Sequence, residues 1–272
     1  TNVFKHKDQR NTTVAKEHKK ISEFIPNIAH VIWFYPPNTT FRFHQMLCLL
    51  SIHRHLHPKV IIFWYSNLPT GPWWAFAKET VPSITVMHKY PPTSIFNKNV
   101  QVPEHQSDIA RIDILLKYGG IYLDLDVIVV KPFHSLYHYP VTMGAETPQL
   151  LGSGIILAQK DATFLKLWKN TYHNFDDTDW NKHSVHKPME LAQLHPDLVH
   201  IDWFSLQRPN WDERQWLYET GKLWDWQSNL AVHLWYREYN VDHDPNSIQT
   251  WNTTAGEVFR YIYYETTSLI LP

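Results

Sequence analysis

The chain has 272 residues, of which 43% are hydrophobic and 19% are charged, with a formal net charge of −1. This is the composition of a globular protein long enough for one large domain or two small ones. The balanced charge gives no sign of a nucleic-acid partner, and no apolar run reaches the roughly 18 residues of a membrane span.

Residues 1–22 are polar and are expected to form a stalk or tail, followed by one domain over residues 23–272. Apolar runs bounded by Pro or Gly predict strands, and apolar residues at helical spacing predict helices. The expected strands are 27–35, 59–66, 83–90, 121–130, 141–146, 153–159, 198–202 and 230–236. The expected helices are 40–57, 71–81, 103–120, 162–172, 187–195 and 254–264.

Near-continuous apolar strands that alternate with helices are typical of an α/β fold with a mostly parallel central sheet and helices on both faces. The Trp-rich, loop-rich stretch from about 202 to 228 is expected to form a lid or subsite of this domain.

Two aspartates, Asp124 and Asp126, interrupt the apolar segment 121–130. In a continuous strand, alternate side chains share a face, so both carboxylates are expected to point the same way. A divalent cation, a shared proton or basic neighbours could offset their repulsion. Hard oxygen ligands favour Mg²⁺ or Mn²⁺. Alternatively, both residues could cap a hydrated turn, but Gly or Asn would then be expected after them, where this chain has VIVV.

The same segment fits the nucleophile strand of haloacid-dehalogenase-like phosphatases, with Asp124 as the nucleophile. That strand usually lies near the start of its domain, whereas here it follows a long stretch of organised α/β sequence that begins at residue 27. A third hypothesis is a catalytically silent carbohydrate-binding protein. We favour an enzyme, because a decayed site usually loses charged groups that cost stability.

The sequence around the pair, SDIARIDILLKYGGIYLDLDVIVV at 107–130, resembles the Asp-x-Asp segment of nucleotide-sugar glycosyltransferases. It is most similar to family 32, which includes α-1,4-galactosyl-, α-1,4-N-acetylglucosaminyl- and yeast α-1,6-mannosyltransferases. IPNIAHVIWF and LAVHLWY resemble the opening strand and the late His-x-Trp segment of that family, so the resemblance covers roughly residues 25 to 240. It implies a GT-A fold, a Rossmann-like sheet that binds a nucleotide sugar.

The resemblance implies that Asp126 binds the metal directly, while Asp124 lies near the ribose and the waters of the metal. His233 is the candidate late ligand, and an imidazole beside carboxylates would favour Mn²⁺ over Mg²⁺. Without the resemblance, His233 would be interpreted as a core histidine on an apolar strand.

The resemblance also implies the residues that bind the donor. Asp108 and Arg111, at i and i+3 on one helix, would contact the hydroxyls of the donor sugar, although by themselves they could form a surface ion pair. Tyr122 would contact the nucleotide and Trp33 would stack on its base. Trp235, two residues after His233, would close over the diphosphate.

Family 32 enzymes retain the anomeric configuration, which requires a carboxylate nucleophile or attack on the face that the leaving group departs from. Besides Asp124 and Asp126, the candidate catalytic carboxylate is Glu146, and Glu190 is a second one. The expected reaction moves a sugar from a UDP-sugar such as UDP-Gal or UDP-GlcNAc to a hydroxyl of a glycan, glycolipid or glycoprotein, forming an α-linkage. GDP-mannose is the alternative donor.

Three Asn-x-Thr sequons, at Asn11, Asn38 and Asn252, are typical of a protein of the secretory pathway. We therefore expect the Golgi lumen as its location, with a type II membrane anchor upstream of Thr1.

Overall fold

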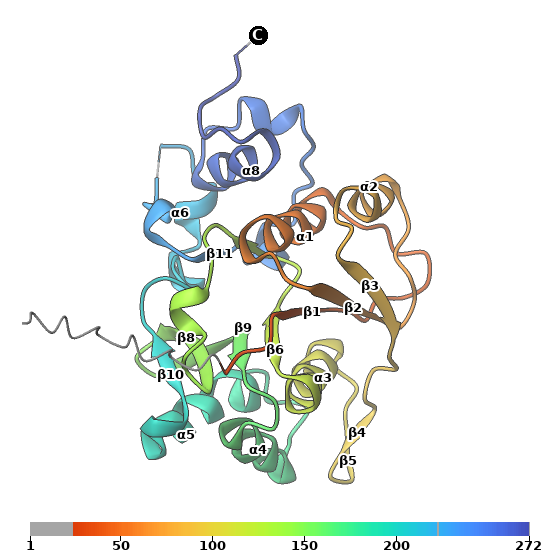
Figure 1. Cartoon of the computed structure of the whole chain (residues 1–272), viewed down its shortest axis with the longest axis vertical. Coiled ribbons are helices and arrows are strands. Elements are labelled where there is room, and N and C mark those ends of the chain that lie inside the picture. Colours follow the sequence, from red (N-terminus) through yellow and green to blue (C-terminus); the bar gives the residue numbers. More distant parts are fainter. Residues whose placement is uncertain (1–23, 222, 272) are drawn as a thin grey trace, which may run out of the picture.

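The computed structural model describes residues 24–221 and 223–271, so the stalk expected at 1–22 lies outside the described residues. A seven-stranded sheet forms the centre, in the order β10-β8-β9-β6-β1-β2-β3 (Figure 1). Its strands are β1 (Ile28–Trp33), β2 (Val60–Tyr65), β3 (Ile84–His88), β6 (Gly120–Leu123), β8 (Val141–Thr147), β9 (Leu150–Ala158) and β10 (His200–Asp202). Two small pairs lie outside it: β4 (Ser94–Ile95) with β5 (Lys98–Asn99), and β7 (Val127–Val129) with β11 (Ala231–His233).

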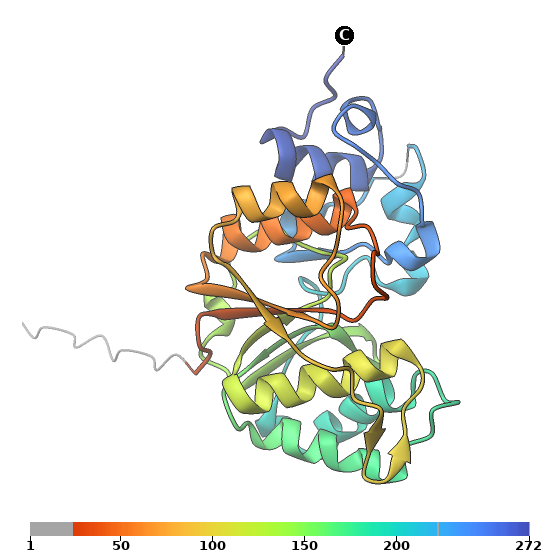
Figure 2. The same ribbon diagram turned by 90° about the vertical axis from the view of Figure 1, so that its right-hand side faces the viewer.

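Helices cover both faces of the sheet. They are α1 (Phe43–Leu56), α2 (Pro72–Thr80), α3 (Pro103–Tyr118), α4 (Thr163–Asn170), α5 (Lys187–Leu194), α6 (Gln215–Tyr218), α7 (Tyr236–Tyr239) and α8 (Thr254–Tyr264). In Figure 2, α1, α2 and α8 lie on one side of the sheet, and α3 and α4 lie on the other. Strand β1 shows why: Val31 packs in the layer under α1, while its neighbour Ile32 packs in the layer over α3.

The predicted mostly parallel sheet is confirmed, and with it the GT-A, Rossmann-like expectation. Strands β6, β1, β2 and β3 run parallel to one another, and so do β10 and β8. Strand β9, however, runs antiparallel to both of its neighbours, β6 and β8. The apolar pattern did not predict this reversal, because a strand buried on both faces looks the same in either direction.

The prediction of one strand over 121–130 is wrong. Strand β6 ends at Leu123, the chain turns through Asp124 and Asp126, and β7 begins at Val127. The two aspartates therefore do not share the face of a strand. Strand β11 is also shorter than expected, since it ends at His233 and α7 follows.

The glycine turn between α3 and β6 allows β6 to enter the sheet directly after the helix, so that the aspartates follow at the carboxyl end of β6. Gly120 has φ +107°, and a Cβ atom there would lie 2.4 Å from the carbonyl oxygen of Ile28. Only glycine fits such a close approach between β6 and β1. The helix can therefore end and the strand can enter the sheet without an intervening loop. Among the described residues, no helix has both the length and the apolar character needed to cross a bilayer.

Candidate active site

The turn that carries the aspartates is held by the surrounding structure. The amide of Val127 donates to the carbonyl of Asp124 over 3.1 Å, which closes the turn. The amide of Asp124 donates to Gly154 on β9 over 2.9 Å, and the amide of Leu234 donates to the carbonyl of Asp126 over 2.8 Å. Gly154 on β9 and Leu234, the residue after β11, thus fix the two ends of the turn, which needs no glycine or asparagine of its own.

The turn and β11 together form a cluster of three potential metal ligands. One ligand atom from each of Asp124, Asp126 and His233 lies within 4.8 Å of the other two. His233 Nε2 lies 3.1 Å from Oδ1 of Asp126, and the amide of Tyr236 donates to Oδ2 of the same carboxylate over 3.1 Å. Two carboxylates and an imidazole are a donor set that fits Mn²⁺ or Mg²⁺. The three ligands expected from the sequence are therefore brought together.

Asp126 and His233 lie within hydrogen-bond distance and shift each other's pKa. Burial raises the pKa of Asp126, but the charge and hydrogen bond of His233 and the amide of Tyr236 more than offset it, so the net shift is downward. Burial lowers the pKa of His233, but the carboxylate of Asp126 reverses the direction. The cluster therefore has a carboxylate anion to offer a cation, and His233 can ligate only in its neutral form.

Asp124 has a second set of partners on the sheet and on α3. The hydroxyl of Tyr122 donates to its Oδ1 over 2.6 Å, and Arg111 Nη2 lies 3.4 Å from the same oxygen. Arg111 also pairs with Asp108 at 3.1 Å and donates to the carbonyl of Ser153 over 2.7 Å. Asp108 and Arg111 are 7% and 5% exposed, so they form a buried ion pair beside the three potential metal ligands, and the alternative of a surface ion pair is wrong.

Glu146, on β8, lies close enough to His233 for their charges to interact. Burial raises the pKa of its carboxyl group, and the charge of His233 partly opposes that rise. A Cβ atom on Gly152 would lie 2.8 Å from Oε1 of Glu146 and 2.6 Å from Nε2 of Gln207. The absence of a side chain at 152 therefore makes room for both residues beside His233.

Gln207 is a site residue that the sequence did not predict. Its side chain is fully buried, its Oε1 lies 3.2 Å from His233 Nδ1, and its Nε2 has no partner among the described residues. It lies in the 202–228 stretch that was expected to act as a lid or subsite, but its segment, SLQRPN, has no helical or strand periodicity. No signal in the sequence singled it out.

The two tryptophans expected at the donor site differ in their surroundings. Trp235 has φ +52°, its ring stacks on that of His233 with 3.8 Å between centroids, and its Nε1 donates to the carbonyl of Pro209 over 3.0 Å. Trp235 was expected on the same strand as His233, and that prediction is wrong, because β11 ends at His233. Trp33 is 1% exposed and lies under the ring of Tyr35, with 4.2 Å between their centroids.

Tyr35 therefore presents the accessible aromatic face at the end of β1, since it is 45% exposed. Loss of solvation, followed by the negative charges of Asp126 and Asp124, raises the pKa of Tyr35. Glu190, the second candidate carboxylate, pairs with Lys187 at 2.5 Å on the exposed surface of α5. It contributes no contact to the cluster.

Comparisons with known proteins agree with this geometry. Residues 19–142 match the family model of the glycosyltransferase sugar-binding region containing a DXD motif. The chain is 34% identical over 239 residues to glucan organizing enzyme 1 of Cryptococcus neoformans var. grubii, a match that covers 80% of this chain and 64% of that protein. It is 38% identical over 60 residues to inositol phosphoceramide mannosyltransferase 3 of Schizosaccharomyces pombe, covering 22% of this chain and 17% of that one.

The chain thus spans less than two thirds of the length of these curated relatives. Among solved structures, the bifunctional glycosyltransferase WbbM superposes with a TM-score of 0.49 and 10% identity, covering 90% of this chain and 50% of that chain. The family match includes Asp124 and Asp126, the two residues at which the structure forms its ligand cluster. Residues 19–142 of the chain are therefore similar to the sugar-binding region of glycosyltransferases that carry a DXD motif, with Asp124 and Asp126 as the two aspartates of that motif.

Proposed function

We propose that the chain is a metal-dependent, retaining glycosyltransferase that moves a hexose from a UDP-sugar to a hydroxyl of a glycan acceptor, forming an α-linkage. The cluster of Asp124, Asp126 and His233 is the observation that carries the proposal. A divalent cation held there would neutralise the diphosphate of the donor and stabilise the departing nucleoside diphosphate. His233 favours Mn²⁺ over Mg²⁺ in this role.

The remaining residues of the site support binding of the donor sugar. Arg111 is held by Asp108, Asp124 and Ser153, so its guanidinium is fixed in position before any ligand arrives. We assign Asp108 and Arg111 to the hydroxyls of the donor sugar, and Tyr122 to the nucleotide. For the base, we assign the end of β1, where Tyr35 covers Trp33.

Glu146 and Gln207 are the groups available for the reacting carbon. Both lie beside His233, on the β8 side of the cluster. The raised pKa of Glu146 makes it a weaker anion than an exposed glutamate, and the unpartnered Nε2 of Gln207 can donate a hydrogen bond to the donor. In a same-face transfer, the leaving diphosphate accepts the proton of the acceptor hydroxyl, and these two side chains hold the sugar in place.

GDP-mannose is the second candidate donor. The name of the fission-yeast relative, a mannosyltransferase, favours it. The phosphatase alternative needs Asp124 as a free nucleophile, but Tyr122 and Arg111 engage that carboxylate. For location we propose the Golgi lumen, because Asn38 and Asn252 are both exposed and can carry glycans.

A thermal-shift screen of UDP- and GDP-sugars with and without Mn²⁺ tests the proposal. We expect one nucleotide to raise the unfolding temperature only when Mn²⁺ is present, and Asp126→Asn to remove that rise. Asp197→Asn, which changes an exposed aspartate away from the cluster, is the matched control. Stabilisation by no nucleotide sugar, or hydrolysis of p-nitrophenyl phosphate that Asp124→Asn abolishes, would overturn it. NMR of the product then gives the anomeric configuration.

A further inference from the structure

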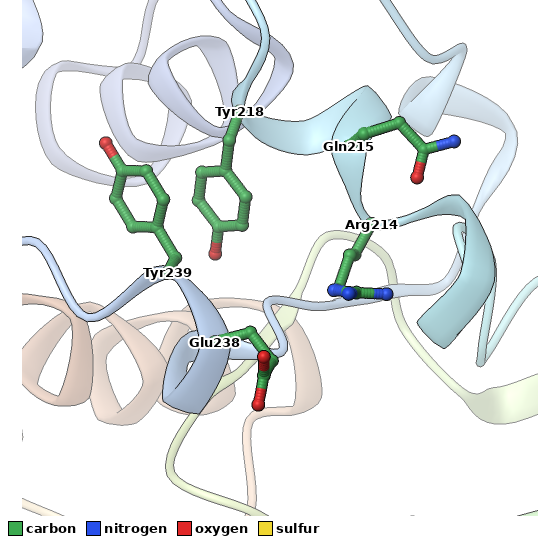
Figure 3. A pocket seen from close by; sticks show the side chains of 5 residues that line it. All are labelled: Arg214, Gln215, Tyr218, Glu238 and Tyr239. Atoms are coloured by element: carbon green, nitrogen blue, oxygen red, sulfur yellow. The ribbon is translucent and has the colours of Figure 1, made fainter.

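A small pocket lies between α6 and α7, separate from the metal cluster. It has a volume of about 220 Å³ and is lined by Arg214, Gln215, Tyr218, Glu238 and Tyr239. Figure 3 shows the two tyrosine rings side by side, with Arg214 and Gln215 from one wall and Glu238 from the other around the same opening.

Both walls of this pocket are connected through hydrogen bonds or one helical turn to residues 234–236, which bind Asp126. Tyr239 lies one helical turn after Tyr236, whose amide donates to the carboxylate of Asp126. From the other wall, the hydroxyl of Tyr218 donates to the carbonyl of Leu234, and the amide of Leu234 donates to Asp126. A molecule in the pocket would therefore lie next to the reaction centre.

The size and charge of the pocket select the class of ligand. Pockets for drug-sized ligands measure about 300–1,000 Å³, so this one has room for a single sugar ring and not for a whole nucleotide sugar. One cation, Arg214, and one anion, Glu238, line it. This balance gives no preference for a phosphate or a carboxylate, which need a surplus of positive charge.

The side chains offer what a neutral, hydroxyl-rich ring needs. Tyr218 and Tyr239 stack with 3.8 Å between centroids and an angle of 4°, and they provide aromatic surface. The carboxylate of Glu238 accepts hydrogen bonds and the amide of Gln215 both donates and accepts them. Within the described residues, neither of these two side chains has a protein hydrogen-bond partner.

The walls are fixed in position without a ligand. Arg214 donates to the carbonyl of Trp211 over 2.6 Å, and its guanidinium lies 4.6 Å from the centre of that ring. The hydroxyl of Tyr239 is 2.9 Å from His243 Nε2. Trp211 in turn meets Trp235 edge to face, with 5.7 Å between centroids. A preformed pocket loses little entropy when it binds.

We infer that this pocket is an acceptor subsite, which binds one neutral sugar residue of the acceptor glycan beside the residue that is glycosylated. The inference rests on the proposed transferase function and names the class of acceptor that this function would use. Donor binding uses the metal cluster and Arg111, whereas recognition of the acceptor uses Arg214, Gln215 and Glu238.

Saturation-transfer NMR of the protein with Mn²⁺ and UDP tests the inference. The probes are galactose, glucose, mannose and N-acetylglucosamine, with lactose, maltose, mannobiose and chitobiose. We expect at least one of these sugars to bind. In the Gln215→Ala/Glu238→Gln double variant, the saturation-transfer signal of that sugar should be at least about fivefold weaker, because the sugar has lost its hydrogen-bond partners. Glu79→Gln, an exposed glutamate on α2, is the control and should retain the signal.

Calorimetric titration of the same samples with UDP and Mn²⁺ distinguishes failure of the acceptor subsite from failure of the proposed transferase function. Unchanged nucleotide binding in the double variant, with loss of the sugar signal, supports the subsite. Nucleotide binding without binding of any probe sugar, or with sugar binding that the double variant keeps, overturns the subsite and leaves the proposed function standing. Absence of binding of UDP to the wild type, and of GDP titrated in the same way, overturns the proposed function, and the acceptor role falls with it.

Discussion

Gly154 and Asp124 lie so close together that no side chain fits between them. The carbonyl of Gly154 accepts the amide of Asp124 over 2.9 Å, and a Cβ atom on Gly154 would lie 2.9 Å from Oδ2 of Asp124. The same Cβ would lie 2.9 Å from Cε1 of His233. One glycine on β9 thus makes room for two members of the ligand cluster.

Gly154→Ala should therefore weaken metal binding without unfolding the protein. The new methyl group displaces Asp124 and His233, so we expect Mn²⁺ affinity to fall by roughly 10- to 100-fold, as for other residues that orient metal ligands. Calorimetric titration with Mn²⁺ measures it. Gly221→Asn is the control, because nothing lies within 4 Å of a Cβ there and asparagine tolerates a positive φ. Wild-type affinity in Gly154→Ala would contradict the cluster.

Arg111→Met should destabilise the whole domain. Removal of the guanidinium leaves the buried carboxylate of Asp108 without its counter-ion, which costs about 3–5 kcal/mol. Denaturant unfolding measures the loss, and the Asp108→Asn/Arg111→Met double variant should recover part of it. Lys169→Met is the matched control, because its pair with Asp113 is about one third exposed and such pairs contribute about 0–1 kcal/mol. Equal losses in the two single variants would refute the prediction.

His30 should make stability depend on pH in mild acid. Its Nε2 lies 2.9 Å from the carbonyl of Gly119, and Trp64 Nε1 donates to its Nδ1, an arrangement that requires the neutral ring. Burial lowers the pKa of His30 from 6.5 to about 4, although the bond to Gly119 opposes this.

A lowered histidine pKa means that the unfolded chain binds the proton more readily than the folded one does. Stability is therefore fully present above pH 6.5 and is lost as the pH falls toward 4, by roughly 3 kcal/mol at pH 4. Denaturant unfolding at a series of pH values checks this. His30→Gln should flatten the dependence in this window, whereas His195→Gln, at an exposed histidine, should leave it unchanged.

Cys48 should be inert in the folded protein. Its thiol is fully buried and donates to the carbonyl of Leu125, in the aspartate turn, over 3.2 Å. Burial, reinforced by the charge of Asp126, raises the pKa of the thiol well above its usual value, so little reactive thiolate is present. A disulfide reagent should react with one thiol in guanidinium chloride and with none in native buffer over the same time. Rapid reaction of the native protein would show that the turn opens readily.

Much of the fold could be predicted from the sequence because its elements have strong local signals. The helix over 103–118 begins at a proline and ends at glycines, and the strand over 60–65 is a continuous apolar run. The direction of β9 was missed, since side-chain pattern carries no information about strand polarity. The break after Leu123 was missed because the turn is held by distant partners, Gly154 and Leu234, instead of by turn-forming residues.

The residues of the site also divide into those with a local sequence signal, which were predicted, and those placed by distant packing, which were not. Asp124, Asp126 and Arg111 lie in one motif whose order is visible in the chain, and His233 was found through a second motif. Gln207 was not predicted as a site residue, because its position beside His233 depends on how an irregular loop packs. The position of Trp33 at the end of β1 was predicted correctly. That the ring of Tyr35 covers Trp33 was not predicted, because this contact depends on packing that the sequence pattern does not show.

The spacing of the three potential ligands has a consequence for biosynthesis. Asp126 and His233 are 107 residues apart; Asp126 directly precedes β7, His233 ends β11, and these two strands pair only with each other. A growing polypeptide therefore completes most of its central sheet before its cation-binding group exists. Chains that stop before β11 would be folded in part yet would lack His233, so the group of three potential ligands would be incomplete in them.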